Sequence, residues 1–126
     1  MKIIDISIAI VKNADNHYLI CLRSHDSHQG GKWEFPGGKV ENNESVEQAM
    51  QRELFEEVGL IATEQRFVEK IFFDYGDKQL NLHFYLIEKF TGEAFGKEGQ
   101  SVKWISKAQF KHYNFPDANK DVILKL

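Results

Sequence analysis

The feature that most constrains this chain is a helical repeat of apolar residues that ends beside a cluster of glutamates. Ser45 and Gln48 have the spacing of a capping box, in which each side chain bonds the other residue's backbone at a helix start. Gly59 is the residue type that most easily adopts the left-handed conformation just past a helix end. The apolar residues between them lie on one helical stripe: Val46, Ala49, Met50, Leu54 and Val58. The pattern predicts one amphipathic helix, packed along that stripe.

The polar side of the same helix carries three carboxylates that share one face. Glu53, Glu56 and Glu57 stand at positions i, i+3 and i+4. Their mutual repulsion disfavours ionisation unless a divalent cation offsets it, and all-oxygen ligands suit Mg²⁺, with Mn²⁺ as a substitute. A cluster of glutamates alone is more often a solvated helix face. Glu44 and Arg52 favour the metal site, because Glu44 can hold Arg52 and Arg52 can orient Glu53.

Two strand pairs are predicted around this helix. Alternating isoleucines over residues 4–10 predict a half-buried strand, and residues 18–23 are expected to pair with it as a hairpin. A second hairpin is expected where residues 67–75 and 80–90 flank the turn residues Gly76 and Asp77.

The remaining elements complete an α+β fold. Residues 101–105 form a short strand candidate, and a last helix is expected from about residue 117 to the end, with its apolar residues inward: Val122, Ile123 and Leu126. Few strands, one central helix and a terminal helix predict a mixed α+β sandwich. The length of 126 residues indicates a single domain, residues 1–126.

Composition excludes several classes of function. The chain has 16 Lys and Arg against 19 Asp and Glu, a net charge of −3, whereas proteins that coat nucleic acid polymers or anionic membranes are basic. The single cysteine, Cys21, excludes an internal disulfide and fits a reducing compartment. The N-terminal apolar run, residues 6–11, is too short for a signal peptide or membrane span. We therefore expect an untargeted, cytoplasmic monomer whose partner is a small molecule.

Residues 38–60 follow the pattern G-x5-E-x7-R-E-U-x-E-E-x-G-U, where U is aliphatic, and this resembles the box of the Nudix hydrolase family at every defined position. The resemblance implies an α/β/α sandwich with a mixed sheet, a central box helix and a C-terminal helix. It also implies Mg²⁺-dependent hydrolysis of a nucleoside triphosphate, with Glu53 accepting a proton from water and Lys39 stabilising the developing charge. The implied catalytic residues are Glu53, Arg52, Glu44 and Lys39. The implied metal ligands are Gly37, Glu53, Glu56, Glu57 and Glu98.

Segments outside the box resemble the members of this family that hydrolyse 8-oxo-dGTP to 8-oxo-dGMP and pyrophosphate, which removes mutagenic oxidised guanine from the nucleotide pool and so protects DNA replication. Residues 34–39, the glycine-bounded loop 96–100 and the segment 115–119 carry this similarity. The implied substrate-binding residues are Arg23, His28, Glu34, Phe35, Pro36, Gly37, Lys78 and Asn119.

The implied role of Asn119 has a chemical reason. Oxidation at C8 of guanine turns the N7 acceptor into an N7–H donor, so a side-chain amide can accept from N7–H while it donates to O6. Unmodified guanine cannot satisfy that pair. Phe35 and Pro36 are expected to form an apolar wall beside the base.

One departure keeps alternatives open. Lys78 stands where the 8-oxo-dGTP-hydrolysing members have arginine, and lysine lacks the planar fork needed for a bidentate or stacked contact. A pyrimidine or pterin triphosphate is therefore an alternative substrate. A non-catalytic nucleotide-sensing module is a further alternative, but such a protein is expected to lack Glu53 or Arg52, and both are present.

Overall fold

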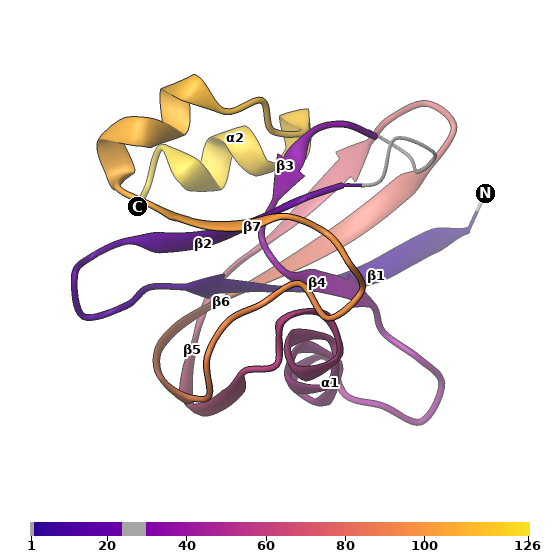
Figure 1. The fold of residues 1–126 in the computed structure, drawn as a ribbon. Helices are drawn as coiled ribbons and strands as arrows, with labels where there is room; N and C mark the ends of the chain where they lie inside the picture. Colours follow the sequence, from indigo (N-terminus) through magenta and orange to yellow (C-terminus); the bar gives the residue numbers. More distant parts are fainter. Residues whose placement is uncertain (1, 24–29) are drawn as a thin grey trace.

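Two small β-sheets lie between helices in the computed structural model, which describes residues 2–23 and 30–126. The elements in chain order are β1 (Ile3–Val11), β2 (Tyr18–Leu22), β3 (Trp33–Glu34), β4 (Gly37–Lys39), α1 (Val46–Val58), β5 (Ile61–Asp74), β6 (Gln79–Thr91), β7 (Val102–Ile105), the 3₁₀ helix η1 (Lys107–His112) and α2 (Asp117–Ile123). In Figure 1, α1 lies below the sheets, and η1 and α2 lie above them. The expected α/β/α arrangement is confirmed.

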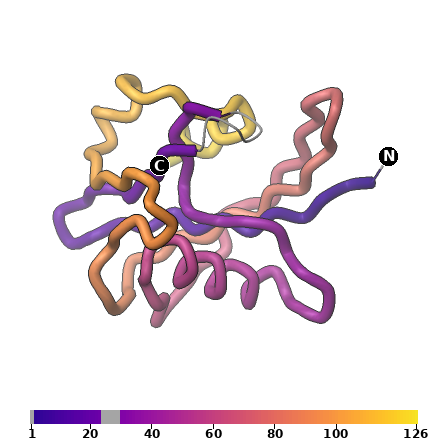
Figure 2. Tube along the Cα trace, turned by 45° about the vertical axis from the view of Figure 1, so that its right-hand side comes forward, coloured from indigo at the N-terminus to yellow at the C-terminus, as the bar shows by residue number. Residues whose placement is uncertain are grey.

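The larger sheet is mixed, as expected. Its strand order is β4-β1-β6-β5, and β1 runs parallel to β6 but antiparallel to β4. Because Ile3 pairs with Gln79, β1 begins at the end of the molecule where the β5–β6 hairpin has its turn (Figure 2). The smaller sheet has the order β3-β2-β7, with antiparallel pairs.

The predicted first hairpin is wrong. β1 and β2 are joined only by an isolated bridge between Lys12 and Tyr18, and β2 belongs to the smaller sheet. β6 pairs with β1 from Ile3 to Val11 and β4 pairs with it from Ile6 to Ile8, so over Ile6–Ile8 neither edge of β1 is open to β2. The prediction of a half-buried strand also fails for Ile8 to Val11, which are buried on both faces because the strand is central and both of its faces are covered.

The second hairpin, the short strand and both helices are confirmed. β5 and β6 are antiparallel, and β5 begins at Ile61, earlier than predicted, with register shifts along its first half. α2 begins at Asp117 and ends at Ile123 rather than at the chain end. The strands β3 and β4 and the helix η1 were not predicted, since each is too short to show a periodic pattern.

Helix α1 has the predicted ends. The Ser45 Oγ accepts from the Gln48 N–H at 3.0 Å, and the Gln48 Oε1 accepts from the Ser45 N–H at 2.8 Å. Gly59 has a φ of 75° and its N–H donates to the Phe55 carbonyl. In addition, the buried Ser7 of β1 donates from its Oγ to the Val46 carbonyl at 2.8 Å, so the helix start is bonded to the central strand.

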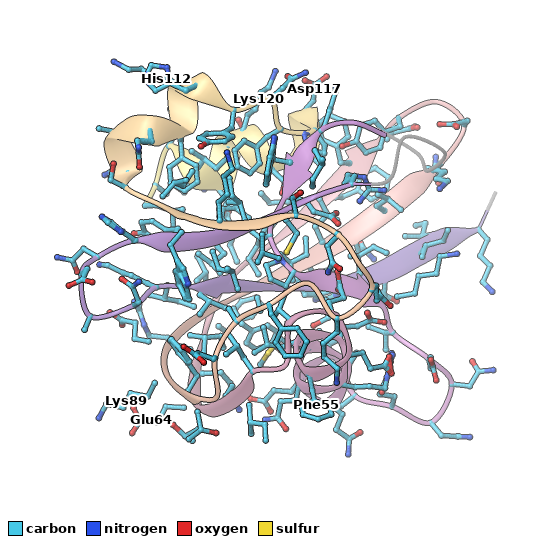
Figure 3. All side chains as sticks on the ribbon, viewed as in Figure 1. Phe55, Glu64, Lys89, His112, Asp117 and Lys120 are labelled. Atoms are coloured by element: carbon cyan, nitrogen blue, oxygen red, sulfur yellow. The ribbon has the colours of Figure 1, made fainter. Side chains whose placement is uncertain are left out.

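The two helical layers present side chains on opposite sides of the molecule. Figure 3 shows Phe55 at the outer side of α1, whereas Asp117 and Lys120, whose charged groups lie 3.0 Å apart, project from α2 on the opposite side. Among the described residues, the longest helix is too short and too polar to cross a bilayer.

Candidate active site

Arg52 is the centre of a bonded cluster on the polar face of α1. Its Nε and Nη2 donate to the two Glu44 oxygens at 2.7 and 3.0 Å, and its Nη1 donates to Glu53 Oε1 at 2.9 Å. Nη2 also donates to the Lys39 carbonyl of β4 at 3.0 Å. The bonds from Arg52 to Glu44, and then the bond from the Glu41 N–H, lower the pKa of Glu44 to about 2. The structure thus brings together Glu44, Arg52 and Glu53 as the sequence predicts, and the guanidinium holds the Glu53 carboxylate in place.

Glu57 is the most buried carboxylate of the helix. It is 9% exposed, and its Oε2 accepts from the Gly37 N–H at 2.9 Å. Burial, followed by the negative charge of Glu34, raises the pKa of Glu57 to about 9. Burial also raises the pKa of Glu53, although Arg52 opposes this shift. Glu56 lies further out and contacts Arg52 at 3.4 Å.

The two glycines of β4 allow this close approach. A Cβ built on Gly37 would lie 2.3 Å from the Ser7 carbonyl oxygen of β1. A Cβ built on Gly38 would lie 2.4 Å from the carboxyl carbon of Glu53. The backbone of the neighbouring strand therefore requires glycine at position 37, whereas glycine at position 38 leaves room for the Glu53 carboxylate.

The loop that carries Glu98 is bonded to the last turn of α1. The Lys97 N–H and the Gln100 Nε2 both donate to the Glu57 carbonyl, at 3.0 and 2.9 Å. The Gln100 Oε1 accepts from the Glu98 N–H at 3.0 Å. Gln100 was not predicted as a site residue, and its place in the glycine-bounded loop 96–100 is the signal that could have indicated it. A cavity of about 250 Å³ in this region is lined by Glu34, Glu57 and Glu98, among others.

The donors gathered here suit a hard cation. Glutamate carboxylates and a glycine carbonyl provide oxygen ligands only, and a bound cation would offset the cost of ionising the buried Glu57. Within residues 2–23 and 30–126, however, no three His, Cys, Asp or Glu side chains converge as a ready metal cage. Instead, the Arg52 guanidinium donates to the Glu53 carboxylate and the Gly37 N–H donates to that of Glu57. The metal ligands therefore stay a prediction.

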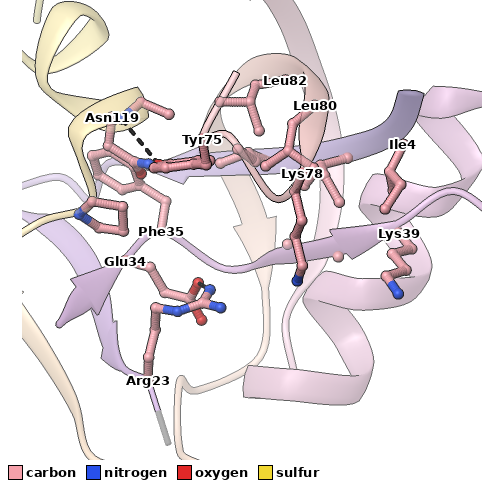
Figure 4. A pocket seen from close by; sticks show the side chains of 16 residues that line it. Ile4, Arg23, Glu34, Phe35, Lys39, Tyr75, Lys78, Leu80, Leu82 and Asn119 are labelled. Atoms are coloured by element: carbon pink, nitrogen blue, oxygen red, sulfur yellow. Dashed lines mark hydrogen bonds and ion pairs between the residues drawn. The ribbon is translucent and has the colours of Figure 1, made fainter. Parts of the chain in front are cut away.

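A cavity of about 230 Å³ adjoins the glutamate face (Figure 4). β1 and β6 provide aliphatic walls, Phe35 closes one side, and the cations Lys39 and Lys78 stand at the end nearest the glutamates. The Arg23 guanidinium forms an ion pair with the Glu34 carboxylate at the cavity wall. An apolar slot with cations at one end can receive a planar base and place an anionic chain toward the carboxylates.

Asn119 lies in this cavity from the first turn of α2. The residue is 7% exposed, and its side chain forms no hydrogen bond with any residue that the structure describes. A buried amide without partners is costly, so a ligand that supplies them is favoured. Pro36, which was expected at the base, does not line the cavity, and Pro116 lines it instead. The Pro36 carbonyl accepts from the Ala9 N–H of β1. The predicted residue His28 lies outside the described residues.

Tyr75 is a pocket residue that sequence reasoning missed. It lines the same cavity from the end of the β5–β6 hairpin, and its hydroxyl oxygen accepts from the Ala118 N–H at 3.2 Å. No sequence pattern indicates this bond, since it joins residues 43 positions apart.

Comparison with known proteins places this geometry in a family. The chain is 42% identical to the 8-oxo-dGTP diphosphatase of Escherichia coli K12 over 126 residues, which are 100% of this chain and 98% of the relative. It is 35% identical to the CTP pyrophosphohydrolase of the same organism, over 94% of this chain and 87% of the relative.

A solved structure from work on MutT of Aliivibrio salmonicida and Vibrio cholerae superimposes with a TM-score of 0.87 at 43% identity, covering 98% of this chain and 96% of the other. The family model of the NUDIX domain matches residues 7–125, a span that includes the glutamate helix, the glycine strand and the start of α2. Since the match spans nearly the whole chain, box helix included, the chain belongs to the Nudix family and is a Nudix hydrolase.

Proposed function

We propose that this protein hydrolyses 8-oxo-dGTP to 8-oxo-dGMP and pyrophosphate, with Mg²⁺ as its metal, and so removes oxidised guanine nucleotides from the pool used for DNA synthesis. The observation that carries the proposal is the buried, unpartnered amide of Asn119 in the cavity beside the glutamate face. The name of the E. coli relative, 42% identical over the full chain, supports the same substrate.

The amide of Asn119 offers one acceptor and two donors to a bound base. Oxidised guanine presents N7–H and O6 side by side, so the Asn119 oxygen can accept from N7–H while its nitrogen donates to O6. Unmodified guanine would place the N7 lone pair against the amide oxygen. A closed pocket built for that bond rejects the unmodified base, because a buried polar group is left unpaired.

Residues of the box supply the hydrolytic chemistry. Glu53 accepts the proton of the attacking water, and Arg52 holds its carboxylate in one orientation through the 2.9 Å bond. Lys39 and Lys78, both at the cavity, attract the phosphates and stabilise charge that develops on them. The carboxylates of Glu53, Glu56, Glu57 and Glu98 with the Gly37 carbonyl would hold Mg²⁺, which when bound offsets the repulsion between an acidic site and an anionic substrate.

A substrate panel tests the proposal. We expect wild-type kcat/KM to be highest for 8-oxo-dGTP among 8-oxo-dGTP, dGTP, CTP and dihydroneopterin triphosphate. Asn119→Ala should lower kcat/KM for 8-oxo-dGTP by about 10- to 100-fold, mostly through KM, and change dGTP hydrolysis little, because dGTP never forms that bond. An equal loss of kcat/KM on both nucleotides would show that Asn119 supports the fold or contacts the sugar rather than the oxidised base.

CTP hydrolysis is the second candidate. The relative named CTP pyrophosphohydrolase is 35% identical over most of this chain, and Lys78 lacks the fork of an arginine. A wild-type preference for CTP in the same panel would favour this function. For either substrate we propose that residues 1–126 act as one domain and as a monomer, which light scattering after size exclusion would test.

A further inference from the structure

The first turn of α2 lacks a cap of its own. Pro116 is the N-cap residue and provides no side-chain acceptor for the N–H groups that a helix start leaves without partners. The Ala118 N–H is satisfied from elsewhere, by the hydroxyl oxygen of Tyr75 at 3.2 Å. Figure 4 shows this bond as a dashed line that ends at Tyr75, next to Asn119.

Tyr75 is itself bonded to the opposite side of the cavity. Its N–H donates to the Lys78 carbonyl at 2.8 Å, which closes the turn of the β5–β6 hairpin. Its ring packs on that of Phe73, with centroids 4.6 Å apart. Tyr75 therefore joins the turn that carries Lys78 to the helix turn that carries Asn119.

The position of Asn119 depends on this connection through Tyr75 more than the position of a residue in a long helix would. α2 has seven residues, and so short a helix has little stability of its own. The Asn119 side chain has no hydrogen bond to hold it among the described residues, so its position follows from the backbone of this turn. Two-point recognition of a base requires an amide placed to within a fraction of an ångström.

We propose that Tyr75 is a positioning residue that sets base selectivity: its hydroxyl replaces the missing cap of α2 and holds the Asn119 amide at the angle needed to read the oxidised base. The effect on selectivity rests on the proposed function. The bond between Tyr75 and Ala118 does not.

Tyr75→Phe removes the hydroxyl and keeps the ring, so the variant should fold. We expect hydrogen exchange at the Ala118 amide to accelerate about fivefold, as for the loss of a helix cap. The ratio of kcat/KM for 8-oxo-dGTP over dGTP should fall about three- to tenfold through KM, with kcat nearly unchanged. In an Asn119→Ala background, Tyr75→Phe should leave that ratio unchanged, because the residue it positions is gone.

Tyr85→Phe is the matched control. Tyr85 is a largely buried tyrosine of β6 whose ring packs on that of the exposed Phe67. It belongs to the core cluster beneath α1 that contains Met50 and Leu54, and it does not line the cavity. The proposal is overturned if Tyr75→Phe behaves like Tyr85→Phe, or if Ala118 exchange accelerates while selectivity stays that of the wild type. The exchange measurement needs no substrate, so it tests the bond to Ala118 even if the wild-type panel contradicts 8-oxo-dGTP as the substrate.

Discussion

Replacing Gly38 by alanine should separate catalysis from folding. The added Cβ would lie 2.4 Å from the carboxyl carbon of Glu53 and 2.6 and 2.7 Å from its oxygens. Since non-bonded carbon atoms approach to about 3.5 Å, the carboxylate has to retreat by about 1 Å. It can do so because it is the end of a flexible side chain, and because the backbone of Gly38 is outside the left-handed region that disfavours alanine.

The expected loss follows from that displacement. A catalytic group moved by about 1 Å costs about 100-fold in rate, which corresponds to about 2.7 kcal/mol of barrier. Gly38→Ala should therefore lower kcat for 8-oxo-dGTP about 100-fold. Tm should fall by less than about 4 °C, because the side chain relaxes at a cost of about 1 kcal/mol. Pyrophosphate release at saturating substrate and thermal unfolding of the same preparation measure the two quantities.

Gly37→Ala provides the contrast, because there the added Cβ would lie 2.3 Å from the Ser7 carbonyl oxygen, in the backbone of a central strand. Backbone cannot retreat as a side chain can, so this variant should lose about 3 kcal/mol of stability. Gly38→Ala with wild-type kcat would refute the placement of Glu53 as the proton acceptor. If Gly38→Ala lost as much stability as Gly37→Ala, the argument that the Glu53 side chain relaxes would be refuted.

Three further predictions concern the carboxylates. Glu53→Gln should lower kcat about 10²- to 10⁴-fold with nucleotide affinity nearly intact, measured by single-turnover kinetics and calorimetry, and a near-wild-type kcat would contradict its role. Activity should vanish in a chelator and return with Mg²⁺ or Mn²⁺ but poorly with Zn²⁺, whereas full activity after exhaustive metal removal would contradict the metal site. The folded-state pKa of Glu57 lies above its ordinary 4.5, at about 9, so in metal-free buffer stability should be full below about pH 4.5 and decline as pH rises toward about 9. Glu57→Gln should remove that decline and raise Tm by roughly 5–10 °C near pH 8, and an unchanged pH profile of thermal unfolding would contradict this assignment.

Local chemistry made the glutamate helix predictable from sequence. The capping box, the stripe of apolar residues and the terminal Gly59 each act within a few positions of one another, so they are present in the sequence and in the structure alike. The same holds for the β5–β6 hairpin, where Gly76 adopts a φ of 94° in the turn. The cluster of Glu44, Arg52 and Glu53 was predictable too, because helical spacing and a short loop bring those side chains together.

The chain's tertiary structure alone decided the features that join distant segments. An alternating pattern shows that residues 4–10 form a strand but carries no information on its neighbours, and β1 pairs with β4 and β6 rather than with β2. Long-range contacts likewise determine why Gly38 is glycine, how Gln100 joins the loop of Glu98 to the Glu57 carbonyl, and how Tyr75 caps the helix of Asn119. Each depends on two backbones that only the packed sheets bring within a few ångströms, and no pattern of neighbouring residues specifies that distance.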